Sequence, residues 1–92
     1  MALIEYGVTT CPLCGGIISA VEGIVTTSHF IADEKDDFWS FSDAAMHERC
    51  FLAWPRRADF VAKFNREMAK HPRPDGIREL MEPDGRVVSI RA

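Results

Sequence analysis

Two short motifs built from metal-binding residue types constrain this chain more than any other feature of its sequence. Cys11 and Cys14 form a C-x-x-C pair, and His47 and Cys50 form an H-x-x-C pair further along the chain. Three thiols and one imidazole, arranged in two closely spaced pairs, are a donor set that tetrahedral structural zinc sites use. No cysteine is left over, since the sequence contains three. We therefore predict one structural zinc ion bound by these four side chains.

The residues after the first pair favour a tight metal-binding turn. Gly15 and Gly16 follow Cys14 directly, and glycine tolerates the positive φ values that such a turn requires. The alternative for a lone C-x-x-C pair is a redox motif, but the alternation of strand, motif and helix expected around a thioredoxin-like site is missing. His29 and His71 are spare candidate ligands, and neither has a cysteine at short spacing.

The pattern before His47 predicts mainly strands. An apolar run from Leu3 to Val8 indicates an edge strand, and β-branched residues dominate from Ile17 to Ala32, with an interruption near Gly23. A polar loop over residues 33–37 then joins this stretch to an aromatic strand over residues 38–41. We expect the two strands to form an antiparallel hairpin.

Two helices should follow this hairpin. Ser42 and Asp43 are good residues for the start of the first helix, which Pro55 should end. On the second helix, Arg57, Val61, Phe64 and Met68 share a largely apolar stripe, with Phe60 beside it.

The last part of the sequence predicts a second hairpin. The turn Pro83-Asp84-Gly85 separates the segments 77–82 and 86–90. A single turn of helix over residues 77–81, capped by Asp75, is the alternative, because a segment this short has no decisive periodicity.

The motifs carry a family resemblance. The sequence Cys-Pro-Leu-Cys-Gly from Cys11, a hairpin, and then His-Glu-Arg-Cys-Phe from His47 resemble a treble-clef zinc finger, and the last motif is similar to the close of the first finger in LIM domains. The segment between the pairs is longer than in LIM fingers, and no second set of four ligands follows. The resemblance implies a single-zinc α+β treble clef, made of a knuckle, a hairpin and a helix, with an added C-terminal helix and a terminal β-hairpin.

The length of 92 residues indicates one domain over residues 1–92. We expect its core at about residues 9–70 and a C-terminal extension over residues 71–92. The chain has neither the basic and apolar start of a signal peptide nor an apolar stretch of about 20 residues that could span a membrane. Together with the cysteine pattern, this predicts a cytoplasmic protein.

The function that we expect is non-catalytic, because four protein ligands close the coordination sphere of zinc and leave no position for an activated water. The resemblance implies contacts with protein or nucleic acid. We expect a protein partner, because Trp and Arg are frequent at binding hot spots, although Trp39 and Trp54 fit core packing equally well. The residues expected on the partner surface are Trp54, Arg56, Arg57, Lys63, Arg66 and Lys70.

The alternative function is nucleic-acid binding through the basic segment 56–73. Lys63, Arg66 and Lys70 recur at a spacing that places three cations on one face of the second helix. The formal net charge of −3 argues against binding through overall charge. An acidic segment, 33–37, is a further candidate contact for a regulatory partner.

Overall fold

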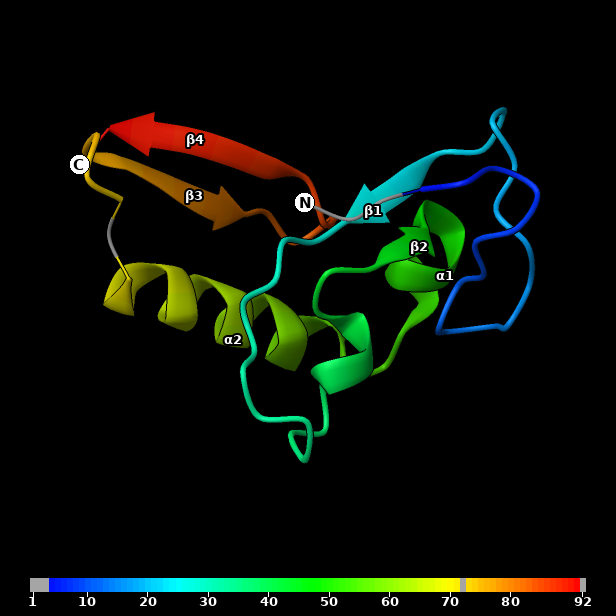
Figure 1. Ribbon diagram of the computed structural model, residues 1–92, viewed down its shortest axis with the longest axis horizontal. Helices are drawn as coiled ribbons and strands as arrows, with labels where there is room; N and C mark the ends of the chain where they lie inside the picture. Colours follow the sequence, from blue (N-terminus) through cyan, green and yellow to red (C-terminus); the bar gives the residue numbers. More distant parts are fainter. Residues whose placement is uncertain (1–3, 72, 92) are drawn as a thin grey trace.

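Two hairpins and two helices build the fold, which a computed structural model describes for residues 4–71 and 73–91 (Figure 1). The elements follow one another as β1 Ile24–Thr26, the 3-10 helix η1 Trp39–Phe41, β2 Ala45–His47, α1 Glu48–Ala53, α2 Arg57–Lys70, β3 Ile77–Met81 and β4 Val87–Arg91. Both two-stranded sheets are antiparallel. The radius of gyration of 13.1 Å is close to the ~13 Å of a compact domain of this size. The two helices and the two antiparallel sheets confirm the α+β class.

The first hairpin pairs β1 with β2, so the predicted pairing with residues 38–41 is wrong. Ile24 lies opposite His47, and Thr26 lies opposite Ala45. Residues Trp39–Phe41 instead form η1. The physical reason is the aromatic packing of Phe41, whose ring lies 4.6 Å from the ring of Trp54 and 6.1 Å from the ring of Phe60.

The predicted helix start at Ser42 is also wrong. The hydroxyl oxygen of Ser42 accepts hydrogen bonds from the backbone amides of Phe30 (2.9 Å) and Ile31 (3.1 Å). It therefore holds a preceding loop in place, and α1 begins only at Glu48. Asp43 adopts a left-handed backbone with φ of 51°, which turns the chain into β2.

The predicted strand near the N-terminus is absent from the described residues. Leu3 lies outside them, and residues 6–8 form a turn in which the amide of Val8 donates to the carbonyl of Glu5 at 3.0 Å. The strand content of the segment 17–32 is also smaller than predicted. It consists of β1 and one isolated bridge between Thr10 and Ile17.

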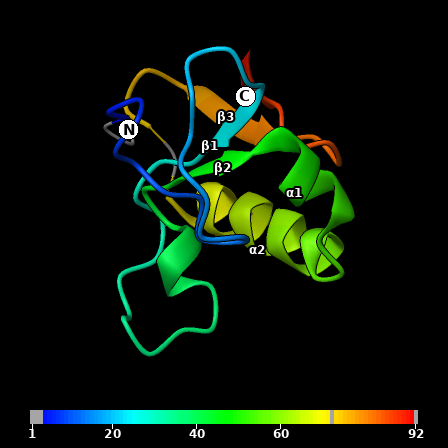
Figure 2. The ribbon, with the colours of Figure 1, turned by 90° about the vertical axis from the view of Figure 1, so that its right-hand side faces the viewer.

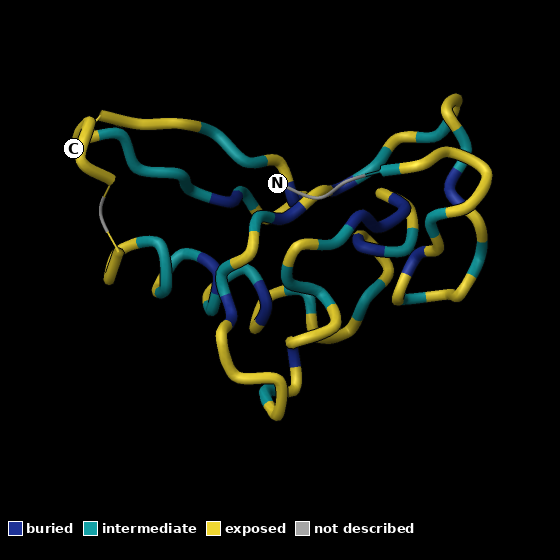
Figure 3. Tube along the Cα trace, viewed as in Figure 1, coloured by how far each residue is buried: buried dark blue, intermediate teal, exposed yellow. Residues whose placement is uncertain are grey.

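The core is dominated by aromatic side chains from α1 and α2. Phe51 on α1 and Phe60 and Phe64 on α2 are fully or almost fully buried, and the burial of the last two fits the stripe predicted for the second helix. The first helix ends where Pro55 predicts, because α1 stops at Ala53. Figure 3 shows buried segments where α2, β3 and the first hairpin meet, whereas most of the N-terminal loops are exposed or half-buried.

The terminal hairpin is confirmed, and the alternative of a helical turn is not. β3 pairs with β4, and Met81 lies opposite Val87. The side-chain amide of Asn65, on α2, donates to the Met81 carbonyl at 3.1 Å, and its oxygen accepts from the Met81 amide at 2.8 Å. Met81 is buried, and Figures 1 and 2 show the hairpin lying along α2. These contacts join residues 77–91 to the core.

Candidate metal centre

The first motif forms the tight turn that its glycines predict. The amide of Gly15 donates to the carbonyl of Cys11 at 2.7 Å, and the amide of Cys11 donates to the carbonyl of Gly16 at 2.8 Å. Gly15 has a φ of 75°, which favours glycine. The amide of Gly16 donates to the sulfur of Cys14 at 3.3 Å. The turn therefore directs a backbone dipole at one of the thiols.

The second motif spans a junction between two elements. His47 is the last residue of β2 and precedes the first residue of α1, whereas Cys50 lies in the first turn of that helix. The prediction that both residues lie on one helix is wrong, since β2 extends to His47. The backbone amide of His47 lies 3.5 Å from the sulfur of Cys11, so the strand end is held directly against the first motif.

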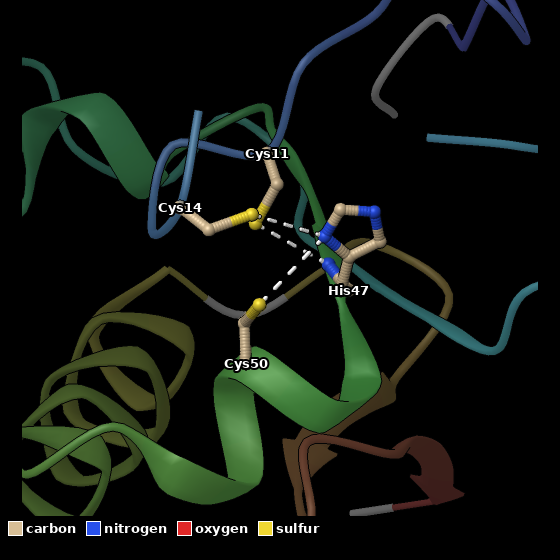
Figure 4. Close-up of side chains that lie close together, drawn as sticks. All are labelled: Cys11, Cys14, His47 and Cys50. Carbon is tan, nitrogen blue, oxygen red and sulfur yellow. Dashed lines mark hydrogen bonds between the residues drawn. The ribbon is translucent and has the colours of Figure 1, made fainter. Parts of the chain in front are cut away.

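The four predicted ligands converge on one point (Figure 4). One donor atom from each of Cys11, Cys14, His47 and Cys50 lies within 4.8 Å of all the others. Nδ1 of His47 lies 3.3 Å from the Cys14 sulfur and 3.7 Å from the Cys50 sulfur. A sulfur and a nitrogen that share a tetrahedral zinc ion are about 3.5 Å apart, given bond lengths near 2.3 and 2.0 Å. The cluster thus fits a single metal ion.

The chemistry of these donors fits zinc and excludes magnesium and calcium. Three sulfurs and one imidazole nitrogen are soft to borderline ligands, which zinc accepts and which magnesium and calcium do not. The structure describes three free cysteines and records no disulfide among them. The fit of the residues to zinc therefore rests on both the distances and the donor types.

The environment of the thiols is asymmetric. Cys11 and His47 are almost completely buried, whereas Cys14 is exposed. The Gly16 amide lowers the pKa of Cys14, and burial raises the pKa of Cys50 to about 11. A metal ion entering this site must therefore displace the proton of Cys50, which couples binding to pH.

The far side of the His47 ring contacts residues that sequence reasoning missed. Nε2 of His47 lies 3.2 Å from the carbonyl oxygen of Ile17 and 3.0 Å from Oε2 of Glu22. Arg49 donates to Oε1 of Glu22 at 2.6 Å, and this bond is the main reason why the pKa of Glu22 falls to about 2. Glu22 carries no local sequence signal, because it meets His47 only after the loop has closed.

The spare histidines lie away from the cluster. His29 packs edge-on against Trp39, with ring centroids 5.9 Å apart. His71 follows the end of α2 and lies 4.0 Å from Glu67. Among the described residues, the group of metal-ligating side chains that could hold an ion contains neither of them.

Some residues predicted for a partner surface already contact other residues of the molecule. Trp54 is half-buried, and its ring lies 5.2 Å from that of Phe60, so core packing accounts for it. Arg56 lies 4.4 Å above the ring of Phe38 and 3.8 Å from a carboxylate oxygen of Asp37. This arginine is therefore already engaged within the molecule.

The basic side chains of α2 are partly neutralised. Lys63 pairs with Asp36 at 2.8 Å and Lys70 with Glu67 at 3.5 Å. Arg66 is exposed, and Arg57 is half-buried beside a cavity that it lines with Val61 and Pro83. No ion pair is recorded for these two arginines within the described part of the chain. The acidic segment and the basic helix, separate in the sequence, thus meet in the fold.

Comparison with known proteins gives no further identification, since no family model, curated protein or solved structure matches the chain. None of the helices in the described residues is long and apolar enough to cross a membrane.

Proposed function

We propose that this chain is a structural zinc-binding module that acts without catalysis, most directly through contacts with another protein. The observation that carries the proposal is the convergence of three sulfurs and one imidazole nitrogen within 4.8 Å. Four protein ligands complete a tetrahedral zinc sphere, so a substrate or water would have no free position on the ion. Zinc bound in this way stabilises the fold and does not activate a reactant.

The arrangement of the ligands supports a treble-clef interpretation. The first pair lies on a tight turn, β1 and β2 form a hairpin, and the second pair spans the end of β2 and the first turn of α1. This is the order that the sequence resemblance implies. In this proposal, α2 and the terminal hairpin are additions to a single-zinc finger.

A protein partner is better supported than a nucleic acid. Four large apolar side chains around the metal-binding turn are more than half exposed, namely Tyr6, Val8, Ile17 and Val21. Exposed apolar groups of this kind favour protein contacts. By contrast, Lys63 and Arg56 already have acidic neighbours. The free thiols suit a reducing compartment, so we also propose a cytoplasmic location.

The test is the metal content of the purified chain, combined with a thiol count under native and denaturing conditions. The proposal expects one zinc per chain and thiols that react slowly until a chelator or denaturant is added. Replacement of zinc by cobalt should give the intense visible absorption of a tetrahedral site with sulfur ligands. Retention of the full fold after complete chelation, followed by circular dichroism, would contradict a structural role for the ion.

A further inference from the structure

The two ring nitrogens of the buried His47 have different neighbours. One nitrogen faces the candidate metal centre, and the other faces two oxygen atoms. Nδ1 of His47 points at the sulfurs of Cys14 and Cys50 (Figure 4). Nε2, on the opposite side of the ring, lies 3.2 Å from the Ile17 carbonyl and 3.0 Å from the Glu22 carboxylate. The side chain of His47 is 1% exposed, so water cannot replace either contact easily.

These neighbours determine where the ring carries its proton. A carbonyl oxygen and an ionised carboxylate only accept hydrogen bonds, and a neutral imidazole has one N–H group. Both oxygen acceptors lie at Nε2, so a proton on Nε2 gives the tautomer that pairs with them, and the lone pair of Nδ1 is then left for a metal ion. An acceptor at the non-ligating nitrogen orients a metal-bound histidine and makes it a better donor.

Glu22 is itself held in place by two further contacts. The guanidinium of Arg49 donates to Oε1 at 2.6 Å, and the amide of Ser19 donates to Oε2 at 3.1 Å. Arg49 lies between His47 and Cys50 on the chain, so one helical turn supplies a ligand and the clamp of the outer carboxylate. The Glu22 side chain is 25% exposed, which leaves this arrangement only partly open to solvent.

We infer that Glu22 is a positioning residue for the metal: it fixes His47 as the Nε2–H tautomer and thereby strengthens binding of the ion through Nδ1. Arg49 supports it by fixing the carboxylate. This inference rests on the proposed zinc-binding function. It gives the loop over residues 17–23 an indirect part in holding the ion, through His47, although none of the four candidate ligands lies in that loop.

Zinc affinity tests the inference, measured by competition with a chromophoric chelator for three variants. Glu22→Ala should bind zinc about 10- to 100-fold more weakly, the range typical for loss of an outer-shell partner of a ligand. Glu22→Gln keeps an oxygen that accepts from Nε2 and should recover part of this loss. Glu48→Ala removes the same charge next to His47 from an exposed side chain and should stay within about threefold of the original chain.

Nitrogen NMR of the histidine ring gives a second measurement that needs no variant. In the original chain loaded with cadmium-113, the ring proton should be on Nε2, and the coupling to the metal should appear at Nδ1. A loaded chain whose Nδ1 carries the proton, or unchanged zinc affinity of Glu22→Ala, would overturn the inference while leaving the zinc site itself intact. An original chain that binds no zinc would instead overturn the proposed function.

Discussion

The carboxylate of Asp36 and the ammonium group of Lys63 lie 2.8 Å apart, although 27 positions separate the two residues. Asp36 belongs to the acidic segment before η1, and Lys63 lies on α2. Both side chains are about one-fifth exposed, at 22% and 20%. Figures 1 and 2 show the loop before η1 projecting from the body of the molecule, and this ion pair joins it to the helix.

The ion pair predicts a definite dependence on pH. The hydrogen bond from Lys63 lowers the pKa of Asp36 below its ordinary value of 3.8. The stabilisation is therefore complete above 3.8 and is lost only as the pH falls through the lower value in the folded chain. A double-mutant cycle with Asp36→Asn and Lys63→Met should give a coupling energy of about 1 kcal/mol, equal at about pH 5 and about pH 7 and smaller in high salt. A coupling that weakens between these two pH values would contradict the assignment.

The same pairing predicts weak binding to nucleic acid. The original chain should not be retained on DNA or RNA at about 50 mM salt, because the paired cations release few counterions. The variant Asp36→Asn/Asp37→Asn serves as the comparison. It removes one acidic neighbour each from Lys63 and Arg56, while Glu67 stays 4.0 Å from Lys63, and it should be retained more strongly. If the original chain is retained at about 50 mM salt and this retention falls steeply at about 200 mM salt, the nucleic-acid function would be favoured.

Loss of His47 should remove the metal. His47→Ala leaves three thiols around a cavity, so we expect zinc to be lost at micromolar concentrations and the thermal transition to broaden or disappear. His71→Ala is the matched control, because His71 is 75% exposed, and it should change stability by less than about 0.5 kcal/mol. Calorimetry and metal analysis measure both effects. Full metal content in His47→Ala would exclude this residue as a ligand.

The turn of the terminal hairpin should tolerate no side chain at Gly85. A Cβ atom there would lie 2.7 Å from Cγ2 of Val25 and 2.9 Å from Cε1 of Phe51, and the φ of Gly85 is 90°. Gly85→Ala should therefore destabilise the fold by about 2 to 4 kcal/mol. Two causes contribute at Gly85, namely backbone strain from the positive φ and steric overlap of the new Cβ atom. Gly76→Ala isolates the backbone strain, because Gly76 has a φ of 76° with open space around it. This variant should lose about 1 kcal/mol of stability. Denaturant unfolding measures the free energy of unfolding of both variants. Equal losses of stability in Gly85→Ala and Gly76→Ala would show that close packing against Phe51 is unimportant.

The sequence predicted the parts of this structure that depend on local chemistry. The turn at Cys11 follows from its glycines, the α2 helix from its apolar stripe, and the terminal hairpin from the turn at Asp84. The convergence of the two motifs was also predicted, because four suitable donors in two closely spaced pairs are typical of a tetrahedral metal site. These features need only the residues within each segment, or a donor set with a preferred geometry.

The errors occurred where distant contacts override local preference. Ser42 has the side chain of a good helix cap, yet its hydroxyl accepts hydrogen bonds from the loop at Phe30. The segment Trp39–Phe41 has the aromatic composition of a strand, but the Phe41 ring packs against Trp54, directly after α1, and against Phe60 on α2. Glu22 was missed for the same reason, since its role depends on the closure of a loop onto His47. Local sequence patterns do not specify which residues distant in the sequence will be in contact in the fold.

Gly85 packs against Phe51, which directly follows the candidate ligand Cys50 in the chain. During synthesis on the ribosome, α1 and both pairs of candidate ligands emerge before the terminal hairpin, whose turn contacts Phe51. One flank of Phe51 therefore stays open to water until the hairpin has been synthesised. The arrival of the hairpin then closes that flank, so slow translation between α2 and the turn would prolong the interval in which a chaperone or a protease can reach it.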